Sequence, residues 1–284
     1  MFFTTCKNTL KNLTRTTTFW LILSVMIIVA AEHAMSACYS MYMPEYDEVI
    51  MDTDPRFVLE YQRYIIHITN SLANLLSYAI PIFAVVTTVI IAQRDFNDNF
   101  FEIEKSLNVK CLKYLLGRII TVFIINCFLV TVCSFFSMHL YVFLRNGVEG
   151  LETWEYLCDS TIRLLRANLF RSYPCIAFYI TLTYGVTTIF KNSIVSALIG
   201  LGYAISNIIV SLYALTEESV YLNYLSPTPL KVMQYLYYYD TEWFGQISII
   251  ETSPLEVSLC LSLILLLATV FFLLSYLRIR KRTV

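Results

Sequence analysis

Few residues of this 284-residue chain could perform catalysis, and the clearest candidates are adjacent to each other. Glu32 and His33 lie within an apolar stretch, where ionisable side chains are costly and often functional. Both lie near one end of that stretch, where water is close, so a hydrated pair is the simpler interpretation. The other histidines, His67 and His139, have no neighbour at metal-ligand spacing. The role of Glu32 and His33 stays open, and we predict no catalytic residue, bound cofactor or metal ion.

The eight cysteines could bind a metal or form a redox pair, but their spacing favours neither role. They are scattered, no Cys-x-x-Cys pair occurs, and most lie in apolar runs, where Cys behaves as a small hydrophobe. The chain also lacks the Gly-x-x-x-x-Gly-Lys-Ser/Thr phosphate loop, the His-Glu-x-x-His zinc motif and the Gly-x-Ser-x-Gly elbow. We therefore expect a non-catalytic protein that neither binds nor hydrolyses ATP on its own.

The segment best suited to bind a protein lies at residues 93–113. Its apolar residues at 96, 100, 103 and 107 form one stripe on a short helix, and Asp95 and Asp98 suit the start of that helix. Apolar residues flanked by charge are typical of an element that docks a soluble partner, although packing on the chain's own helix ends would explain the stripe equally well. The predicted docking residues are Asp95, Phe96, Phe100, Phe101, Glu102, Ile103, Glu104 and Leu107.

A second candidate surface, for the bilayer, is the stretch 1–16. Its apolar residues recur at helical spacing, and Lys and Asn residues fill the opposite face. This pattern suits a helix in the membrane interface, with its apolar side in the acyl boundary and its lysines toward anionic headgroups. A disordered basic tail is the alternative. The predicted interfacial helix carries Phe2, Phe3, Lys7, Leu10, Lys11 and Leu13.

The composition requires a bilayer to position these elements. Hydrophobic residues make up 57% and charged residues 14% of the chain, against about 45–50% and about 25% in soluble domains. Six runs approach the roughly 20 apolar residues that a membrane helix needs. We predict an all-α membrane protein with a single transmembrane domain over 1–284 and an interior nearly free of charge. The six predicted transmembrane helices cover about 18–38, 72–92, 115–143, 173–190, 194–215 and 255–277.

The basic residues orient this bundle. Thirteen of the 20 Lys and Arg residues lie before the first predicted helix, between the second and third, between the fourth and fifth, or after the sixth, with Arg118, near the start of the third helix, counted in the cytoplasmic loop before it. Most acidic residues fall in the segments on the other side. The positive-inside rule then predicts a multi-pass protein of the cell membrane with both termini in the cytoplasm.

This layout resembles the permease subunit of type-2 ABC exporters. Such a subunit has six helices, an N-terminal elbow helix, a coupling helix in the first cytoplasmic loop, and an outer re-entrant hairpin between helices five and six. The resemblance implies an elbow over about 2–15, a coupling helix over about 95–105 and a hairpin over 216–254. Glu102 and Glu104, followed by Leu107-Asn108-Val109-Lys110, are similar to the family's acidic turn and Leu-Pro-Val-like step, with Asn108 where proline is common.

The resemblance also implies partners. Cytoplasmic ABC ATPase subunits would bind ATP and Mg, and a second permease, identical or different, would complete the path for a hydrophobic or amphipathic cargo such as a peptide, lantibiotic or drug. No nucleic acid partner is expected. The alternative is a membrane scaffold or sensor without transport function that binds a cytoplasmic partner through the same loops. A neighbouring gene for a lone ATPase would favour the exporter.

Overall fold

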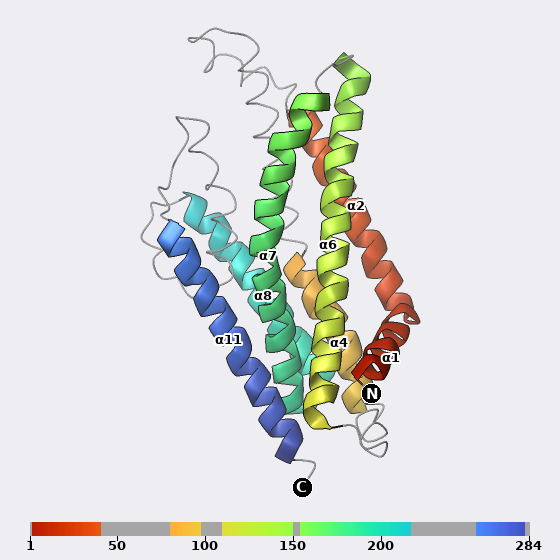
Figure 1. Cartoon of the computed structure of the whole chain (residues 1–284), viewed down its shortest axis with the longest axis vertical. Coiled ribbons are helices and arrows are strands. Elements are labelled where there is room, and N and C mark those ends of the chain that lie inside the picture. The colour runs from red at the N-terminus through yellow and green to blue at the C-terminus, as the bar shows by residue number, and fades with distance from the viewer. Residues whose placement is uncertain (1, 41–79, 98–109, 150–153, 217–253, 282–284) are drawn as a thin grey trace.

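The computed structural model describes residues 2–40, 80–97, 110–149, 154–216 and 254–281. Within these ranges the chain forms seven α-helices and no strand, as expected of an all-α membrane protein (Figure 1). The helices are α1 (Phe2–Thr14), α2 (Thr17–Ser40), α4 (Ile80–Asn97), α6 (Cys111–Glu149), α7 (Trp154–Phe190), α8 (Ser193–Thr216) and α11 (Pro254–Lys281).

Three of these helices contain a segment long and apolar enough to cross a bilayer. The segments are Cys111–Ser137 in α6, Ser172–Phe190 in α7 and Leu261–Arg280 in α11. The pair α1 and α2, bent by 73°, adds a fourth if it is counted as one span, and α8 contains the shorter apolar segment Ser193–Ser206. Part of the second predicted membrane helix and most of the hairpin over 216–254 lie outside the described residues, so the count of six stays a prediction.

Helix α7 forms the centre of the described bundle. Its apolar segment is the most buried of the three, and α4, α6, α8 and α11 all pack against it (Figure 1). Helix α2 runs along α6, while α1 lies across the lower parts of α6 and α4. Large apolar side chains remain exposed on the outer faces of α2, α6, α8 and α11. Those faces suit contact with lipid, where exposing apolar surface carries no penalty.

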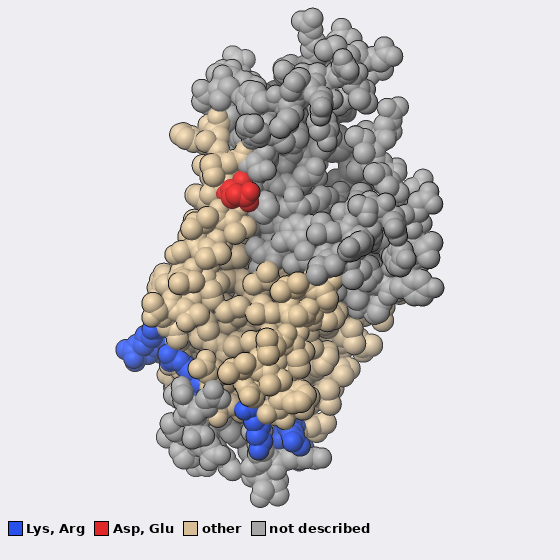
Figure 2. All heavy atoms as spheres, turned by 180° about the vertical axis from the view of Figure 1, so that it is seen from behind, with Lys and Arg blue, Asp and Glu red and all other residues tan. Residues whose placement is uncertain are grey.

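The Lys and Arg residues whose side chains the structure describes lie toward one end of the bundle. The start of α1 and the end of α11 both lie there (Figure 1), and the Lys and Arg side chains gather over the same end in Figure 2. The acidic side chain visible in that view lies farther up the molecule. Among the side chains described, the basic residues thus lie toward the end that the sequence predicts to be cytoplasmic, and the orientation stays a prediction.

Two long helices depart from their predicted bounds. Helix α7 begins at Trp154 and continues through Pro174, although we predicted a helix start at 173. A hydropathy criterion detects only apolar segments. It therefore misses residues 154–172, which include charged side chains and need not lie in the bilayer. Helix α6 has 39 residues, about 58 Å at 1.5 Å per residue, so it projects beyond a hydrocarbon core of about 30 Å.

Polar groups fix the tight turns at the basic end. The backbone N and the Oγ1 of Thr16 both donate to the Leu13 carbonyl, at 3.1 and 2.6 Å, and Trp20 Nε1 donates to the Thr14 carbonyl at 2.7 Å. Between α7 and α8, Lys191 adopts a left-handed backbone with φ of 56°, and the Asn192 Oδ1 accepts the Ile194 N–H at 2.9 Å. These contacts satisfy helix-terminal groups that would otherwise lack partners.

Close packing of α8 depends on a glycine. A Cβ atom at Gly200 would lie 2.8 Å from Val85 Cγ1 on α4 and 2.9 Å from Thr183 Oγ1 on α7, whereas a Cβ atom at Gly202 would meet nothing within 4 Å. Small residues let membrane helices approach closely, which strengthens their packing.

We predict that Gly200→Ala destabilises the bundle by about 1–3 kcal/mol, the usual cost of overpacking. Gly202→Ala is the matched control, because the added methyl group has room and alanine favours helix by about 1 kcal/mol over glycine. Thermal unfolding of the two variants in the same detergent measures the difference. Equal midpoints for Gly200→Ala and Gly202→Ala would contradict the close approach of α8.

Candidate functional site

A buried ion pair joins α4 to α6 near the basic end of the bundle. Asp95 lies in the last turn of α4 and Arg118 in the second turn of α6. Arg118 Nη2 lies 2.9 Å from Asp95 Oδ1, and the side chains of Arg118 and Asp95 are 1% and 0% exposed. Burying one such charge alone would be very costly, so each side chain requires the other. The pair therefore fixes these two helix ends relative to each other.

Aromatic side chains complete the environment of the pair. The Tyr184 hydroxyl of α7 donates to Asp95 Oδ2 at 2.7 Å. The Arg118 guanidinium carbon lies 5.1 Å from the centre of the Tyr114 ring, within the range of a cation–π contact. The Phe96 ring packs near Tyr184, with centroids 6.2 Å apart. Both carboxylate oxygens of Asp95 are thus engaged, one by α6 and the other by α7.

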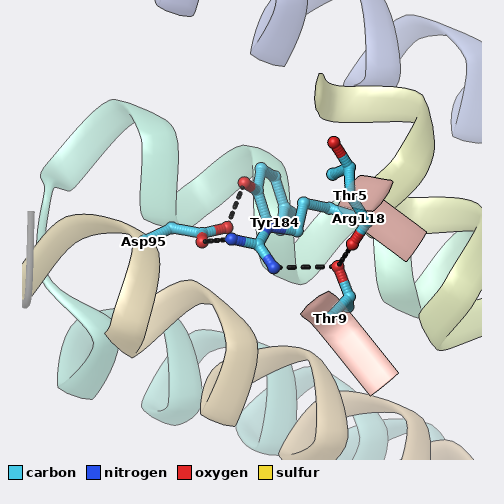
Figure 3. Close-up of polar contacts among 5 residues, drawn as sticks. All are labelled: Thr5, Thr9, Asp95, Arg118 and Tyr184. Carbon is cyan, nitrogen blue, oxygen red and sulfur yellow. Dashed lines mark hydrogen bonds and ion pairs between the residues drawn. The ribbon is translucent and has the colours of Figure 1, made fainter. Parts of the chain in front are cut away.

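The same guanidinium reaches the N-terminal helix. Arg118 Nη1 donates to Thr9 Oγ1 at 2.8 Å, and Thr9 Oγ1 donates to the Thr5 carbonyl at 2.7 Å. Figure 3 shows Arg118 between Asp95 on one side and Thr9 on the other. We refer to Thr5, Thr9, Asp95, Arg118 and Tyr184 as the Asp95–Arg118 network. It joins α1, α4, α6 and α7 through charged or hydroxyl groups.

Two predicted docking residues lie elsewhere than expected. Asp95 was expected at the start of a docking helix, but α4 continues to Asn97 and its last turn buries Asp95 against Arg118. Phe96 is half-buried and packs against the core. Asp95 is therefore a structural residue in this conformation and not part of an exposed docking surface. The other predicted docking residues lie outside the described residues: Phe100, Phe101, Glu102, Ile103, Glu104 and Leu107.

The sequence reasoning did not predict the buried Asp95–Arg118 pair. We had assigned Arg118 to the cytoplasmic loop, and the sequence reasoning missed Thr9 and Tyr184 as its partners in the network. One signal in the sequence could have found the pair. Asp95 ends one apolar run and Arg118 lies near the start of the next, and opposite charges at facing helix ends are expected to pair.

Helix α1 forms as predicted, but its faces differ from the prediction. Its fully buried residues are Thr5, Thr9 and Leu13. Phe3 and Leu10 are 84% and 46% exposed, and Lys7 and Lys11 are also exposed while Phe2 is half-buried. The predicted apolar face is therefore divided, because the hydroxyl groups of Thr5 and Thr9 turn toward the bundle and leave Phe3 and Leu10 on the outside.

Further side-chain hydrogen bonds join other pairs of helices. Asn126 Nδ2 of α6 donates to Thr87 Oγ1 of α4 at 2.9 Å. Beside the turn between α7 and α8, the hydroxyls of Thr187 and Ser196 are 2.5 Å apart. Such contacts stabilise membrane bundles by roughly 0.6–2 kcal/mol each. We interpret these side chains as structural.

The remaining sequence candidates do not assemble a site in the described part of the chain. Glu32 is exposed on α2, and the His33 side chain lies outside the described residues. No group of three or more His, Cys, Asp or Glu residues that could hold a metal ion occurs among the residues described. Compared with known proteins, the chain matches no family model and no curated protein. The Asp95–Arg118 network is therefore the best-defined candidate site.

We predict that Arg118→Met destabilises the folded protein by about 3–5 kcal/mol, because it leaves Asp95 buried without its counter-charge. The double variant Asp95→Leu, Arg118→Met removes both charges and should recover much of that loss. Chemical unfolding in detergent micelles measures both. A double variant at least as unstable as Arg118→Met alone would show that the paired charges do not dominate this contact.

Proposed function

We propose that the chain is the transmembrane permease subunit of an ATP-driven exporter similar to type-2 ABC exporters. It would move a hydrophobic or amphipathic substrate, such as a peptide, lantibiotic or drug, out of the cell. The observation that carries this proposal is the ion pair at the base of the segment 98–109. Asp95 lies in the last turn of the helix that precedes that segment, and Arg118 lies in the helix that follows it.

A docking segment must pass the movement of its partner to the membrane helices. The Asp95–Arg118 pair joins the last turn of α4 to the beginning of α6, so a force on segment 98–109 would act on both helices jointly. Tyr184 and Thr9 extend the connection to α7 and α1. An external ATPase that binds the segment would therefore act on several helices at once. Ion pairs of this depth persist because separating them is costly.

The arrangement of α1 supports the same proposal. The helix bends by 73° from α2 at the basic end of the bundle, and its exposed side carries both Phe3 and Leu10 and the charged Lys7 and Lys11. That mixture suits a helix in the membrane interface. We extend the proposal to both termini in the cytoplasm, six membrane helices, and an outer hairpin over 216–254.

The proposed division of labour places ATP and Mg on separate cytoplasmic ATPase subunits. A second permease, identical or different, would form the other half of the transport path. Apolar and aromatic residues dominate the chain, so a path between two such subunits favours apolar or amphipathic cargo.

The first test is co-purification. We expect an ATPase about the size of a nucleotide-binding domain to be recovered with the tagged chain from mild detergent, and the partner-free chain to bind no nucleotide. Mass spectrometry identifies the partner, and equilibrium binding of a fluorescent ATP analogue tests the isolated chain. Recovery of a partner without ATPase activity would favour the scaffold or sensor, and nucleotide binding by the isolated chain would contradict the division of labour.

The second test concerns segment 98–109. If Phe100 and Phe101 occupy the ATPase groove, truncation to alanine should cost about 2 kcal/mol or more per anchor, which is more than tenfold in affinity. Phe100→Ala and Phe101→Ala should then uncouple ATP hydrolysis from transport in the reconstituted complex. Glu104→Ala is the matched control, because a charge at the rim affects mainly the association rate.

Full coupling in the Phe100→Ala, Phe101→Ala double variant would mean that segment 98–109 is only a connector. The turn Phe190–Ser193 would then be the next candidate for docking.

A further inference from the structure

We propose that α1 docks reversibly on Arg118. Asp95 controls this docking, although none of its described hydrogen bonds or ion pairs goes to α1. The proposal concerns the described bundle alone and does not rest on the exporter function. Arg118 is then a positioning residue that links the end of α4 to the N-terminal helix.

The docked helix presents a row of small polar side chains and one leucine to the bundle. Its buried side chains form one row, Thr5, Thr9 and Leu13, spaced by four residues. At Gly117 of α6 the approach is so close that a Cβ atom would lie 2.8 Å from Thr5 Cγ2. Cys6 Sγ donates to the Gly117 carbonyl at 3.8 Å. Leu13 is the only large apolar side chain in the row, and Thr9 makes the hydrogen bond to Arg118.

The undocked helix would bind the membrane interface. Phe3 and Leu10 are exposed in the docked state, and exposed Lys7 and Lys11 lie beside them. An amphipathic helix of this kind is stabilised in the membrane interface by its apolar side chains and its lysines. Leaving the bundle therefore need not unfold α1.

Arg118 makes docking depend on Asp95. The guanidinium is a rigid planar fork, so the direction of one nitrogen fixes the direction of the other. With Nη2 on Asp95 Oδ1 and the Tyr114 ring against the guanidinium, Nη1 points to Thr9 Oγ1. A displacement of the α4 end, which leads directly into segment 98–109, would turn the fork away from Thr9.

An effect of Asp95 on α1 that passes through Arg118 can be distinguished from an effect that passes through the direct contact between α4 and α1. Among the described contacts, the hydrogen bonds and ion pairs of Asp95 go to α6 and α7 and not to α1. Helices α1 and α4 nevertheless touch. An effect of Asp95 on α1 that requires Thr9 passes through Arg118, whereas an effect that persists without Thr9 passes through the α1–α4 contact.

The native Cys6 reports the docked state. It is half-buried against Gly117, so undocking of α1 should expose it to a thiol reagent. We would label the full-length protein in lipid vesicles with N-ethylmaleimide and quantify modification of each cysteine by mass spectrometry over time. Cys175, which is fully buried in α7, monitors the integrity of the bundle.

Thr9→Val should speed Cys6 labelling by roughly tenfold, the factor expected for the loss of a charge-assisted hydrogen bond. Thr9→Ser keeps the hydroxyl and should label at the wild-type rate, as should Thr4→Val, at an exposed position of the same helix. Labelling of Cys6 in Thr9→Val at the wild-type rate would overturn the proposal. So would equal acceleration at Cys6 and Cys175, because the whole bundle would then have loosened.

Asp95→Asn should also speed Cys6 labelling, but should add little in the Thr9→Val background. Tyr184→Phe, which removes only the hydroxyl that donates to Asp95, is the milder second variant and should act in the same direction. If Cys6 is labelled at the wild-type rate in both variants, Asp95 does not control the docking of α1. If the effects of Asp95→Asn and Thr9→Val on the labelling rate are fully additive, the effect of Asp95 does not pass through Arg118.

Discussion

The pairing of two buried charges constrains the rest of the described bundle. Asp95 and Arg118 lie in helices that must each bury a charge at the same depth, and neither charge is tolerable without the other. This requirement fixes the relative height and rotation of α4 and α6. The second oxygen of Asp95 and the second nitrogen of Arg118 then determine where Tyr184 of α7 and Thr9 of α1 must lie. One electrostatic requirement thus positions four helices.

Packing elsewhere in the bundle follows from weaker and more local contacts. Helix α8 packs on α4 and α7 because Gly200 leaves room for Val85 and Thr183. Paired hydroxyls and Asn126 add hydrogen bonds where helices meet. The outer faces of α6 and α11 carry apolar side chains that need no protein partner in lipid. The specific, directional contacts therefore lie at helix crossings, and the network near the basic end is the most polar of them.

The sequence predicted the elements better than their contacts. Helical periodicity predicted α1, and long apolar runs predicted the membrane segments of α6, α7 and α11, because both signals are local. The start of α7 at Trp154 was missed because a hydropathy criterion does not follow a helix out of the bilayer. The burial of Asp95 and Arg118 was missed because a pair is a property of two helix ends, and each charge by itself resembles a solvated loop residue. The inward turn of Thr5 and Thr9 depends on Arg118 in the same way.

The chemistry of Asp95 also bears on the source of energy for the proposed transport. An acid that couples transport to an ion must exchange its partners during the cycle. Both oxygens of Asp95 are engaged, one by a guanidinium and the other by a tyrosine hydroxyl, so a cation would have to displace Arg118 from a buried site. That exchange would leave the Arg118 charge uncompensated among four helices. The pair is better suited to remain intact through a cycle of movement, which is the behaviour that the proposed subunit, driven by an external ATPase, requires.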